Sequence, residues 1–304
     1  MAEEASDGQH FYGGQAVVEG VMMRGRDVWA IAVRRPDATI HVESHDIDSL
    51  VARHPIFRQP GLRGVIALGQ ALSIGFKALS ISARESSPEE ERLSSRQMAV
   101  SMTIAGVIFL AIFIVLPAVA FRWVGHHVGS SIVVNALEGV FRVLLFLGYL
   151  LIIGRAKEIR RVFEYHGAEH KTIAAFEHHD PLDREHVARY STLHVRCGTN
   201  FLLLVMMITI FVFAVFGNPG IWWRIGSRIV AIPIIAGIAF EMLRLGARFP
   251  NSLVIRGLMT PGLWLQKITT KPPDDAQIDV AIASFNEVLR REREPQERAP
   301  AADA

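Results

Sequence analysis

Long apolar segments alternate with charged ones along this chain, and the apolar segments set its predicted architecture. Residues 98–121 contain no charged side chain, so a helix built from them would be longer than the roughly 30 Å of a bilayer's hydrocarbon core. Three further segments, 132–153, 200–216 and 229–245, have a similar apolar character. The pattern predicts a mainly α-helical membrane protein with about four transmembrane helices.

The N-terminal part has a different pattern, in which short extended stretches alternate with turn residues. Residues 15–19, 28–34 and 39–43 read as strands, and Pro36 with Asp37 supplies a turn between the second and the third. These stretches predict a small β-meander. The glycines around them are spaced too irregularly for a phosphate-binding loop, so we expect turn geometry to explain them.

Two further helices are predicted outside the four spans. Residues 62–83 are moderately apolar but contain Lys77 and several small residues, which favours an interfacial or re-entrant helix over a simple span. Near the C-terminus, Asp274 or Asp275 caps an amphipathic helix. The apolar stripe of that helix consists of Ile278, Ile282, Phe285 and Leu289.

These patterns divide the chain into six parts. They are a disordered tail (1–10), a small cytosolic β subdomain (11–60), an interfacial helix with a linker (61–96), a four-helix transmembrane domain (97–247) that includes a cytosolic His-rich segment (155–199), a cytosolic C-terminal segment with the amphipathic helix (248–290), and a second disordered tail (291–304).

The distribution of positive charge predicts the orientation in the membrane. The segment 154–199 carries eight Lys or Arg residues, whereas the loops 122–131 and 217–228 together carry three. By the positive-inside rule, we expect both termini and the His-rich segment to lie in the cytosol of a multi-pass plasma-membrane protein. Because the first ten residues have no apolar core, no cleaved signal peptide is expected.

The composition indicates which classes of binding partner the protein is expected to have. A net charge of +2 is too small to indicate a nucleic-acid partner, so the lipid bilayer is the partner that the sequence predicts. The single cysteine excludes an internal disulfide. The substrate and the oligomeric state stay open, with a homo-oligomer as one option.

The strongest chemical signal is the His-x-x-Glu-His pattern of His166, Glu169 and His170. On a helix, residues four apart share a face, so the two imidazoles could bind one divalent metal ion, with zinc the first candidate, while Glu169 acts as a proton acceptor. This is the inverted zincin pattern. The competing explanation is chance, which leaves a solvated helix end with Lys171 as a membrane-surface charge.

The remaining ligands are expected from outside that helix. No proline interrupts residues 154–180, so the second span is predicted to continue as a helix that carries both histidines. Glu177 would lie about 10 Å beyond His170, too far to share its ion. We therefore expect His194 and Cys197 to approach the pair.

The number of ligands would decide what the site does. Three protein ligands leave a fourth position for water, as in catalytic zinc sites, whereas four close the site and make it structural. The sequence leaves both open. Cys197 has its own alternative, since Arg196 and the start of the next helix would favour a nucleophilic thiolate.

Charged residues also occur inside the predicted spans. Glu138 and Arg142 are four apart, and Glu241 and Arg244 are three apart. Ion pairing within the bundle is the simpler explanation, and a polar pathway or binding site is the alternative.

Four motifs together resemble the YqhQ-like family of bacterial membrane proteins. They are residues 13–24 (Gly-Gly-Gln-Ala-Val-Val-Glu-Gly-Val-Met-Met-Arg), 165–171 (Tyr-His-Gly-Ala-Glu-His-Lys), 194–199 (His-Val-Arg-Cys-Gly-Thr) and 261–266 (Pro-Gly-Leu-Trp-Leu-Gln). That family is a domain of unknown function, number 1385, sometimes labelled a predicted metal-dependent enzyme, and the resemblance covers about residues 11–290.

The resemblance implies a metal at five positions and a bacterial inner-membrane location. The five positions are His166, Glu169, His170, His194 and Cys197. It also implies a role for the first motif, so that Gln15, Glu19 and Arg24 could approach the same site.

Two functions follow as hypotheses. The first is a membrane-bound, metal-dependent hydrolase that acts on a peptide, a lipid or a small molecule at the cytosolic face. The second is a non-enzymatic scaffold or small transporter, in which the His and Cys residues form a structural metal site.

Overall fold

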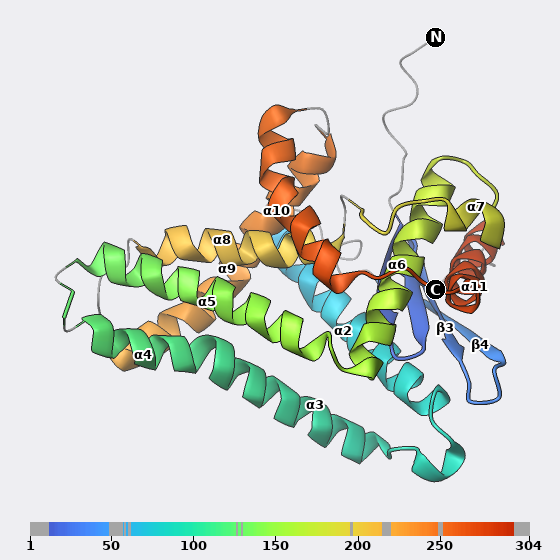
Figure 1. Ribbon diagram of the computed structural model, residues 1–304, viewed down its shortest axis with the longest axis horizontal. Coiled ribbons are helices and arrows are strands. Elements are labelled where there is room, and N and C mark those ends of the chain that lie inside the picture. Colours follow the sequence, from blue (N-terminus) through green and yellow to red (C-terminus); the bar gives the residue numbers. More distant parts are fainter. Residues whose placement is uncertain are drawn as a thin grey trace, which may run out of the picture.

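In the computed structural model, a four-stranded sheet and its covering helices lie at one end of a bundle of long apolar helices (Figure 1). The structure describes residues 12–48, 57, 59, 62–125, 127–128, 130–194, 197–214, 220–248 and 252–294. Both predicted tails therefore fall largely outside the described residues.

The sheet is the predicted β-meander, with one more strand than the sequence pattern indicated. Its antiparallel strands follow chain order: β1 (Gly13–Val17), β2 (Gly20–Arg24), β3 (Val28–Arg34) and β4 (Ile40–Asp46). Glu19, expected inside the first strand, lies in the β1–β2 turn at a φ of 50°. The next residue begins β2 and must be glycine, because a Cβ on Gly20 would lie 2.5 Å from the Ala32 carbonyl oxygen.

Helices cover both faces of the sheet, which explains why β3 is apolar at nearly every position. On one face, α6 (Lys157–Glu177), α7 (Arg184–Ala188) and α11 (Asp275–Arg293) enclose an apolar core with Met23, Tyr165 and Phe285. On the other face, α2 (Leu62–Glu85) packs Ile74 and Ala78 against the strands.

The predicted C-terminal amphipathic helix is confirmed as α11. Asp274 is its N-cap and forms a capping box with Gln277. Ile278 and Phe285 are fully buried against the sheet side of the core, and Ile282 and Leu289 pack partly buried around it. The helix continues to Arg293, into the region expected to be a disordered tail, while residues 295–304 lie outside the described residues.

The bundle consists of helices that extend away from the sheet (Figure 1). They are α3 (Ser95–Leu110), which continues through the π-helical turn η3 (Ala111–Val115) into α4 (Leu116–Gly125), then α5 (Ser131–Ile153), α8 (Gly198–Ala214) and α9 (Ile221–Arg248). A short helix η2 (Glu89–Glu91) precedes them, and α10 (Leu253–Thr269) follows.

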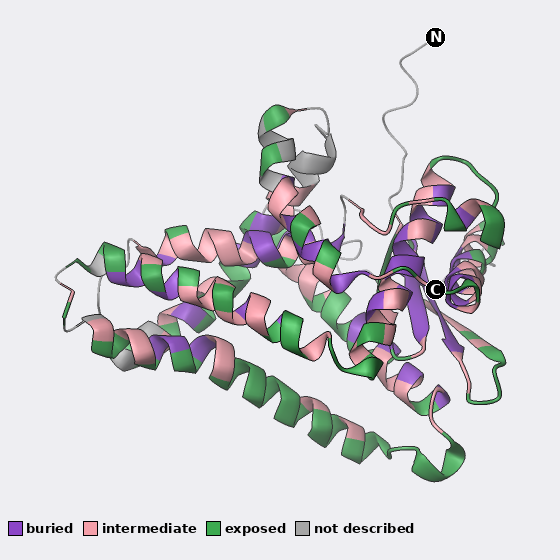
Figure 2. Ribbon diagram, viewed as in Figure 1, coloured by how far each residue is buried: buried purple, intermediate pink, exposed green. Residues whose placement is uncertain are grey.

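Within the described residues, four helices are long and apolar enough to cross a membrane, as the sequence predicted, but one of the four is a different helix. They are Leu62–Glu85, Ser95–Val124, Ile132–Ile153 and Ile225–Leu243. The expected third span, 200–216, is represented by α8, which is shorter within the described residues. Many residues of the bundle helices are exposed (Figure 2), and they include apolar side chains such as Val107, which is 61% exposed. Such a surface is typical of contact with lipid.

Helix α2, expected to be interfacial, has the composition of a span but packs half its length against the sheet. Its Ser82 hydroxyl donates to the Val18 carbonyl at 2.8 Å, and Arg24 donates to Gln70 at 2.7 Å. Its first turn instead contacts α9, where Arg63 binds Glu241. The apolar residues of α2 therefore serve sheet packing as well as contact with the bundle.

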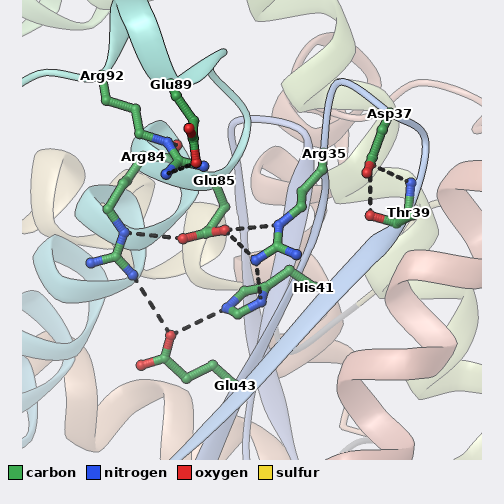
Figure 3. Close-up of polar contacts among 9 residues, drawn as sticks. All are labelled: Arg35, Asp37, Thr39, His41, Glu43, Arg84, Glu85, Glu89 and Arg92. Carbon is green, nitrogen blue, oxygen red and sulfur yellow. Dashed lines mark hydrogen bonds and ion pairs between the residues drawn. The ribbon is translucent and has the colours of Figure 1, made fainter.

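A polar network attaches the end of α2 to the β3–β4 hairpin (Figure 3). The Glu85 carboxylate accepts hydrogen bonds from Arg35, at 2.7 and 2.9 Å, and from Arg84, at 3.1 Å. Arg35 also donates to Nδ1 of His41 at 3.0 Å. Glu43 and His41 complete the contact on β4.

The predicted continuous helix from the second span through the two histidines is wrong. α5 ends at Ile153 and α6 begins at Lys157, after a turn at residues 154–156. The physical reason is that α6 buries one face against the sheet, so it must leave the direction of the bundle. The Lys271 N–H, which donates to the Phe163 carbonyl at 2.9 Å, fixes α6 from the other side.

Candidate metal centre

Two elements bring three potential metal ligands together at the junction of the sheet and the bundle. His166 and His170 lie one turn apart on α6, with their ring centres 4.4 Å apart. Cys197 directly precedes α8, and its Sγ lies 3.2 Å from Nε2 of His166. One ligand atom from each of these three residues lies within 4.8 Å of the others.

Backbone carbonyl groups fix the orientation of both imidazoles. Nδ1 of His166 lies 2.9 Å from the Thr269 carbonyl, and Nδ1 of His170 lies 2.5 Å from the Thr192 carbonyl. A carbonyl oxygen only accepts, so Nδ1 of each ring carries the hydrogen and Nε2 keeps its lone pair. Burial also lowers the pKa of both rings, that of His170 to about 3, so both are neutral. Metal-binding histidines have this arrangement.

Two buried polar atoms at the site have no hydrogen-bond partner among the described residues: Nε2 of His170 and Oε2 of Glu169. Leaving such a group unsatisfied costs about 1–3 kcal/mol. The donor set of two imidazoles and one sulfur suits a borderline ion such as zinc. The residues present therefore fit a metal ion, and a bound cation would satisfy the imidazole.

Glu169 lies on the sheet side of α6, where β1 approaches it closely. A Cβ on Gly14 would lie 2.8 Å from the Glu169 carboxyl carbon, so Gly14 is needed for close approach and not for a turn. Burial raises the pKa of Glu169 to about 8, and a hydrogen bond from the Gly14 backbone opposes that rise. When the Glu169 carboxyl is ionised, its negative charge raises the pKa of Cys197.

The environment of Cys197 does not favour a free thiolate. Burial and the nearby Glu169 charge together raise the pKa of the thiol to about 11, although hydrogen bonds from Thr199 oppose this rise. A nucleophilic cysteine requires the opposite shift. Arg196, which suggested that alternative, lies outside the described residues.

His194 lies next to the three residues without joining their compact group. Its Nε2 is 3.2 Å from Oε2 of Glu177, and its ring centre is 5.7 Å from that of His170. Glu177, which seemed too distant to share an ion with His170, is thus the partner of His194. Lys171 donates to the Ala188 and Tyr190 carbonyl groups and holds the loop before His194.

A buried glutamine that sequence reasoning did not single out fixes the main chain of His194. The Gln266 side chain accepts from the His194 N–H and donates to its carbonyl, both at 2.8 Å, and also donates to Asn200 at 3.2 Å. The only available signal was its place in the fourth motif, because nothing in local periodicity marks a glutamine that binds a distant main chain.

The residues of the first motif divide between the two faces of the sheet. Gln15 and Arg24 contact Gly75 and Gln70 on α2, away from α6. Glu19 instead accepts hydrogen bonds from Arg161, at 2.5 Å for one contact, and from the Tyr165 hydroxyl at 3.1 Å.

The electrostatic balance at Glu19 keeps it ionised. Burial raises the pKa of Glu19, but the hydrogen bonds and positive charge of Arg161 outweigh burial, and the net pKa is lowered. Glu19 therefore holds the β1–β2 turn against α6 one turn before His166.

The charged residues of the bundle form their own contacts. Glu138 accepts from Arg142 and from Arg228, each at 2.7 Å, so the expected α5 pair includes a third member on α9. Glu241 is bound by Arg63 of α2. The side chain of Arg244, its expected partner, lies outside the described residues.

Comparison of the sequence with known proteins identifies the family to which the chain belongs. A family model described as a protein of unknown function (DUF1385) matches residues 59–291. The chain belongs to this family. It is also 37% identical over 300 residues to the uncharacterized protein YqhQ of Bacillus subtilis (strain 168), covering 92% of this chain and 93% of that protein. No solved structure matches. The family match extends from the start of α2 into α11 and so includes His166, His170 and Cys197.

Proposed function

We propose that His166, His170 and Cys197 bind a divalent metal ion, most simply zinc, and that the protein is a membrane-bound metal-dependent hydrolase. The observation that carries the proposal is the convergence of one imidazole nitrogen from each histidine and one sulfur within 4.8 Å. Three protein donors are typical of catalytic zinc sites, in which water or substrate takes the fourth position.

A simple hydrogen bond explains only part of this arrangement. The Cys197 thiol could donate to Nε2 of His166, which would satisfy that pair without a metal. Nε2 of His170 would still be buried without a partner, although its Nδ1 is anchored to the Thr192 carbonyl. Because a bound cation accounts for all three donor atoms, it is the better explanation.

The surrounding residues have distinct roles in the proposed reaction. The ion would supply Lewis-acid polarisation of a carbonyl group or a water molecule. The positive charge of a bound ion would keep the Glu169 carboxyl ionised, so that it can accept the proton of the attacking water, and the Gly14 backbone orients it. Thr269 and Thr192 hold the imidazoles in the tautomers that leave Nε2 available.

The position of the site suggests where the substrate is met. Tyr12 contacts Phe285 of α11, and the sheet and α11 lie together at one end of the bundle (Figure 1). This is the arrangement expected if both termini and the site face the cytosol. A bacterial plasma-membrane location with this orientation agrees with the positive charge of 154–199. The substrate classes that suit such a surface are peptides, lipid headgroups and small metabolites.

Metal analysis of the purified protein tests the proposal. We expect about one zinc per chain in the parent, loss of that metal in His166→Ala and His170→Ala, and retention in the control His186→Ala. His186 is a suitable control because it pairs with Asp183 on the surface, at 2.8 Å. A parent without metal, or metal retained in both site variants, would exclude these ligands.

The Glu169→Gln variant tests the catalytic role of Glu169 separately from metal binding. We expect this variant to keep its metal and to lose hydrolysis of any substrate that the parent turns over, because the amide cannot accept the proton. Full activity would exclude the base role of Glu169 and would favour a structural metal site.

A further inference from the structure

We propose that the metal centre lies at the depth of the lipid headgroups and that its substrate is a membrane lipid with an ester or amide bond. This inference rests on the proposed hydrolase and names the substrate class of that site. It also assigns α10 a position along the membrane surface, in the same layer as the metal.

The apolar parts of three bundle helices end at one common level, where the bundle meets the sheet. Leu150 of α5, Leu203 of α8 and Leu265 of α10 belong to one buried cluster. Ile153, the last residue of α5, and Ile268, in the last turn of α10, pack against the same cluster. Because the chain becomes polar just beyond this level in α5 and α10, the hydrocarbon of a surrounding bilayer would end there.

The exposed side chains change in character at the same level. Leu151 and Ile152, at the end of α5, are 49% and 67% exposed. Arg155 and Lys157, which follow within five residues, are exposed cations. A change from exposed apolar to exposed positive side chains is typical of the end of a membrane span that meets anionic headgroups.

The metal-binding residues lie just beyond this level. Cys197 precedes Phe201, which begins the uncharged apolar run of α8, by four positions, or about 6 Å along a helix. The Thr269 carbonyl, which orients His166, directly follows Ile268. The headgroup layer of a bilayer is roughly 5–8 Å thick on each side. These positions therefore place the three donors at headgroup depth.

Helix α10 has one exposed stripe with the composition expected at a membrane surface. Leu253 is 82% exposed, Trp264 is 63% exposed, and Lys267 is exposed in the last turn. Leu253 and Trp264 are eleven residues apart, close to three full turns, so they share a face. Figure 1 shows α10 crossing the direction of α8 where the bundle meets the sheet. An exposed Trp beside an exposed Lys suits contact with headgroups better than contact with the hydrocarbon core.

Headgroup depth favours a lipid among the three substrate classes. The ester and amide bonds of membrane lipids join the acyl chains to the headgroup, so they lie at the boundary of the hydrocarbon. Hydrolysis would break the acyl C–O or C–N bond, form a C–O bond to the water oxygen, and move the water proton through Glu169 to the leaving group. The exposed Arg155 and Lys157 would attract an anionic headgroup.

Fluorescence quenching in lipid nanodiscs tests the position of α10. The fluorescence that Trp264→Phe removes from the parent is measured with a nitroxide label either on the lipid headgroup or deep in the acyl chain. We expect the headgroup label to quench it more strongly. Trp29→Phe is the control, because Trp29 is 3% exposed within the sheet and its fluorescence should be quenched by neither label. An unquenched Trp264, or one quenched mainly by the acyl-chain label, would overturn the inference.

Binding of hydroxamates to the zinc-loaded protein in nanodiscs tests the substrate class. We expect dodecanohydroxamate to bind about ten-fold or more tightly than acetohydroxamate, because its chain can lie in the bilayer while its head reaches the zinc. If the zinc lay away from the membrane, partition into lipid would withdraw the long-chain probe from the site and remove this preference. His170→Ala is the control that separates binding at the metal from partition into the bilayer.

Failure of this inference can be distinguished from failure of the proposed metal site. A parent that binds neither zinc nor acetohydroxamate would overturn both. A parent that binds zinc and acetohydroxamate without preferring the long chain would leave the metal site intact and overturn only the lipid substrate.

Discussion

At the scale of single residues, two features define the site: buried polar atoms that have no hydrogen-bond partner among the described residues, and a glycine that brings only backbone close to them. His170 and Glu169 each keep a buried polar atom without a hydrogen bond among the described residues, while Gly14 supplies only backbone beside the carboxylate. Such groups are costly unless they serve a bound ligand or the chemistry.

Gly14→Ala should disturb the site while leaving the sheet folded. Its methyl group would lie 2.8 Å from the Glu169 carboxyl carbon, so either β1 or the carboxylate must move. We expect activity to fall at least ten-fold, with the secondary structure unchanged by circular dichroism. Gly13→Ala is the matched control, since it lies in the same strand with nothing within 4 Å of the added methyl group. Equal activity in the two variants would contradict the close approach.

At the scale of elements, the placement of α6 decides the geometry of the site. The helix is held by the sheet on one side and by the α10–α11 connection on the other, and it no longer follows the direction of α5. Contacts at its N-terminal half, above all Glu19 with Arg161, orient the turn that carries His166.

The Glu19–Arg161 contact should make stability depend on pH. The pKa of Glu19 is lowered in the folded protein, so its contribution is present above the unfolded pKa of about 4.3 and is lost as pH falls through the folded value. Glu19→Gln should cost on the order of 1 kcal/mol near pH 7. The difference in melting temperature between parent and variant should shrink below about pH 4.

A surface pair provides the control for that measurement. Glu185 binds Arg189 on the exposed side of α7, and both side chains are more than 60% exposed. Glu185→Gln should change the melting temperature little at any pH, because exposed ion pairs contribute about 0–1 kcal/mol. A gap between parent and Glu19→Gln that did not vary with pH would show that Glu19 is not ionised in the fold.

At the scale of the whole molecule, the bundle contains a buried ionic network of its own, far from the candidate metal centre beside the sheet. Glu138 binds Arg142 and Arg228 about 20 Å along α5 from the end that meets α6. This network ties α5 to α9 inside an apolar bundle.

Glu138→Gln should therefore destabilise the bundle without affecting the metal. Removing one partner of a buried ionic network costs about 3–5 kcal/mol, since the remaining charges lose their compensation. We expect a clear drop in melting temperature in detergent, with zinc stoichiometry per folded chain unchanged. A parent-like melting temperature would show that the network contributes little, and loss of zinc would show that the bundle and the metal centre are coupled.

The sequence by itself determined what depends on near neighbours in the chain. Composition and helical spacing predict the apolar segments long enough for a bilayer, a cap at Asp274 or Asp275, and the shared face of His166 and His170. The capping box that Asp274 forms with Gln277 came from the structure. Cys197 was also anticipated, because it lies just before an apolar helix and the chain can turn back toward α6.

Only the tertiary structure decided the contacts between residues far apart in sequence. No pattern in the neighbouring sequence indicates the turn after α5 or the approach of Gly14 to Glu169. The same is true of the hydrogen bonds between Gln266 and the main chain of His194, and of the pairing of Glu241 with Arg63. Each depends on how whole elements pack, and packing energy is the sum of many small terms spread over the fold. A periodicity can show which face of a helix is buried, but it cannot show which distant atom that face meets.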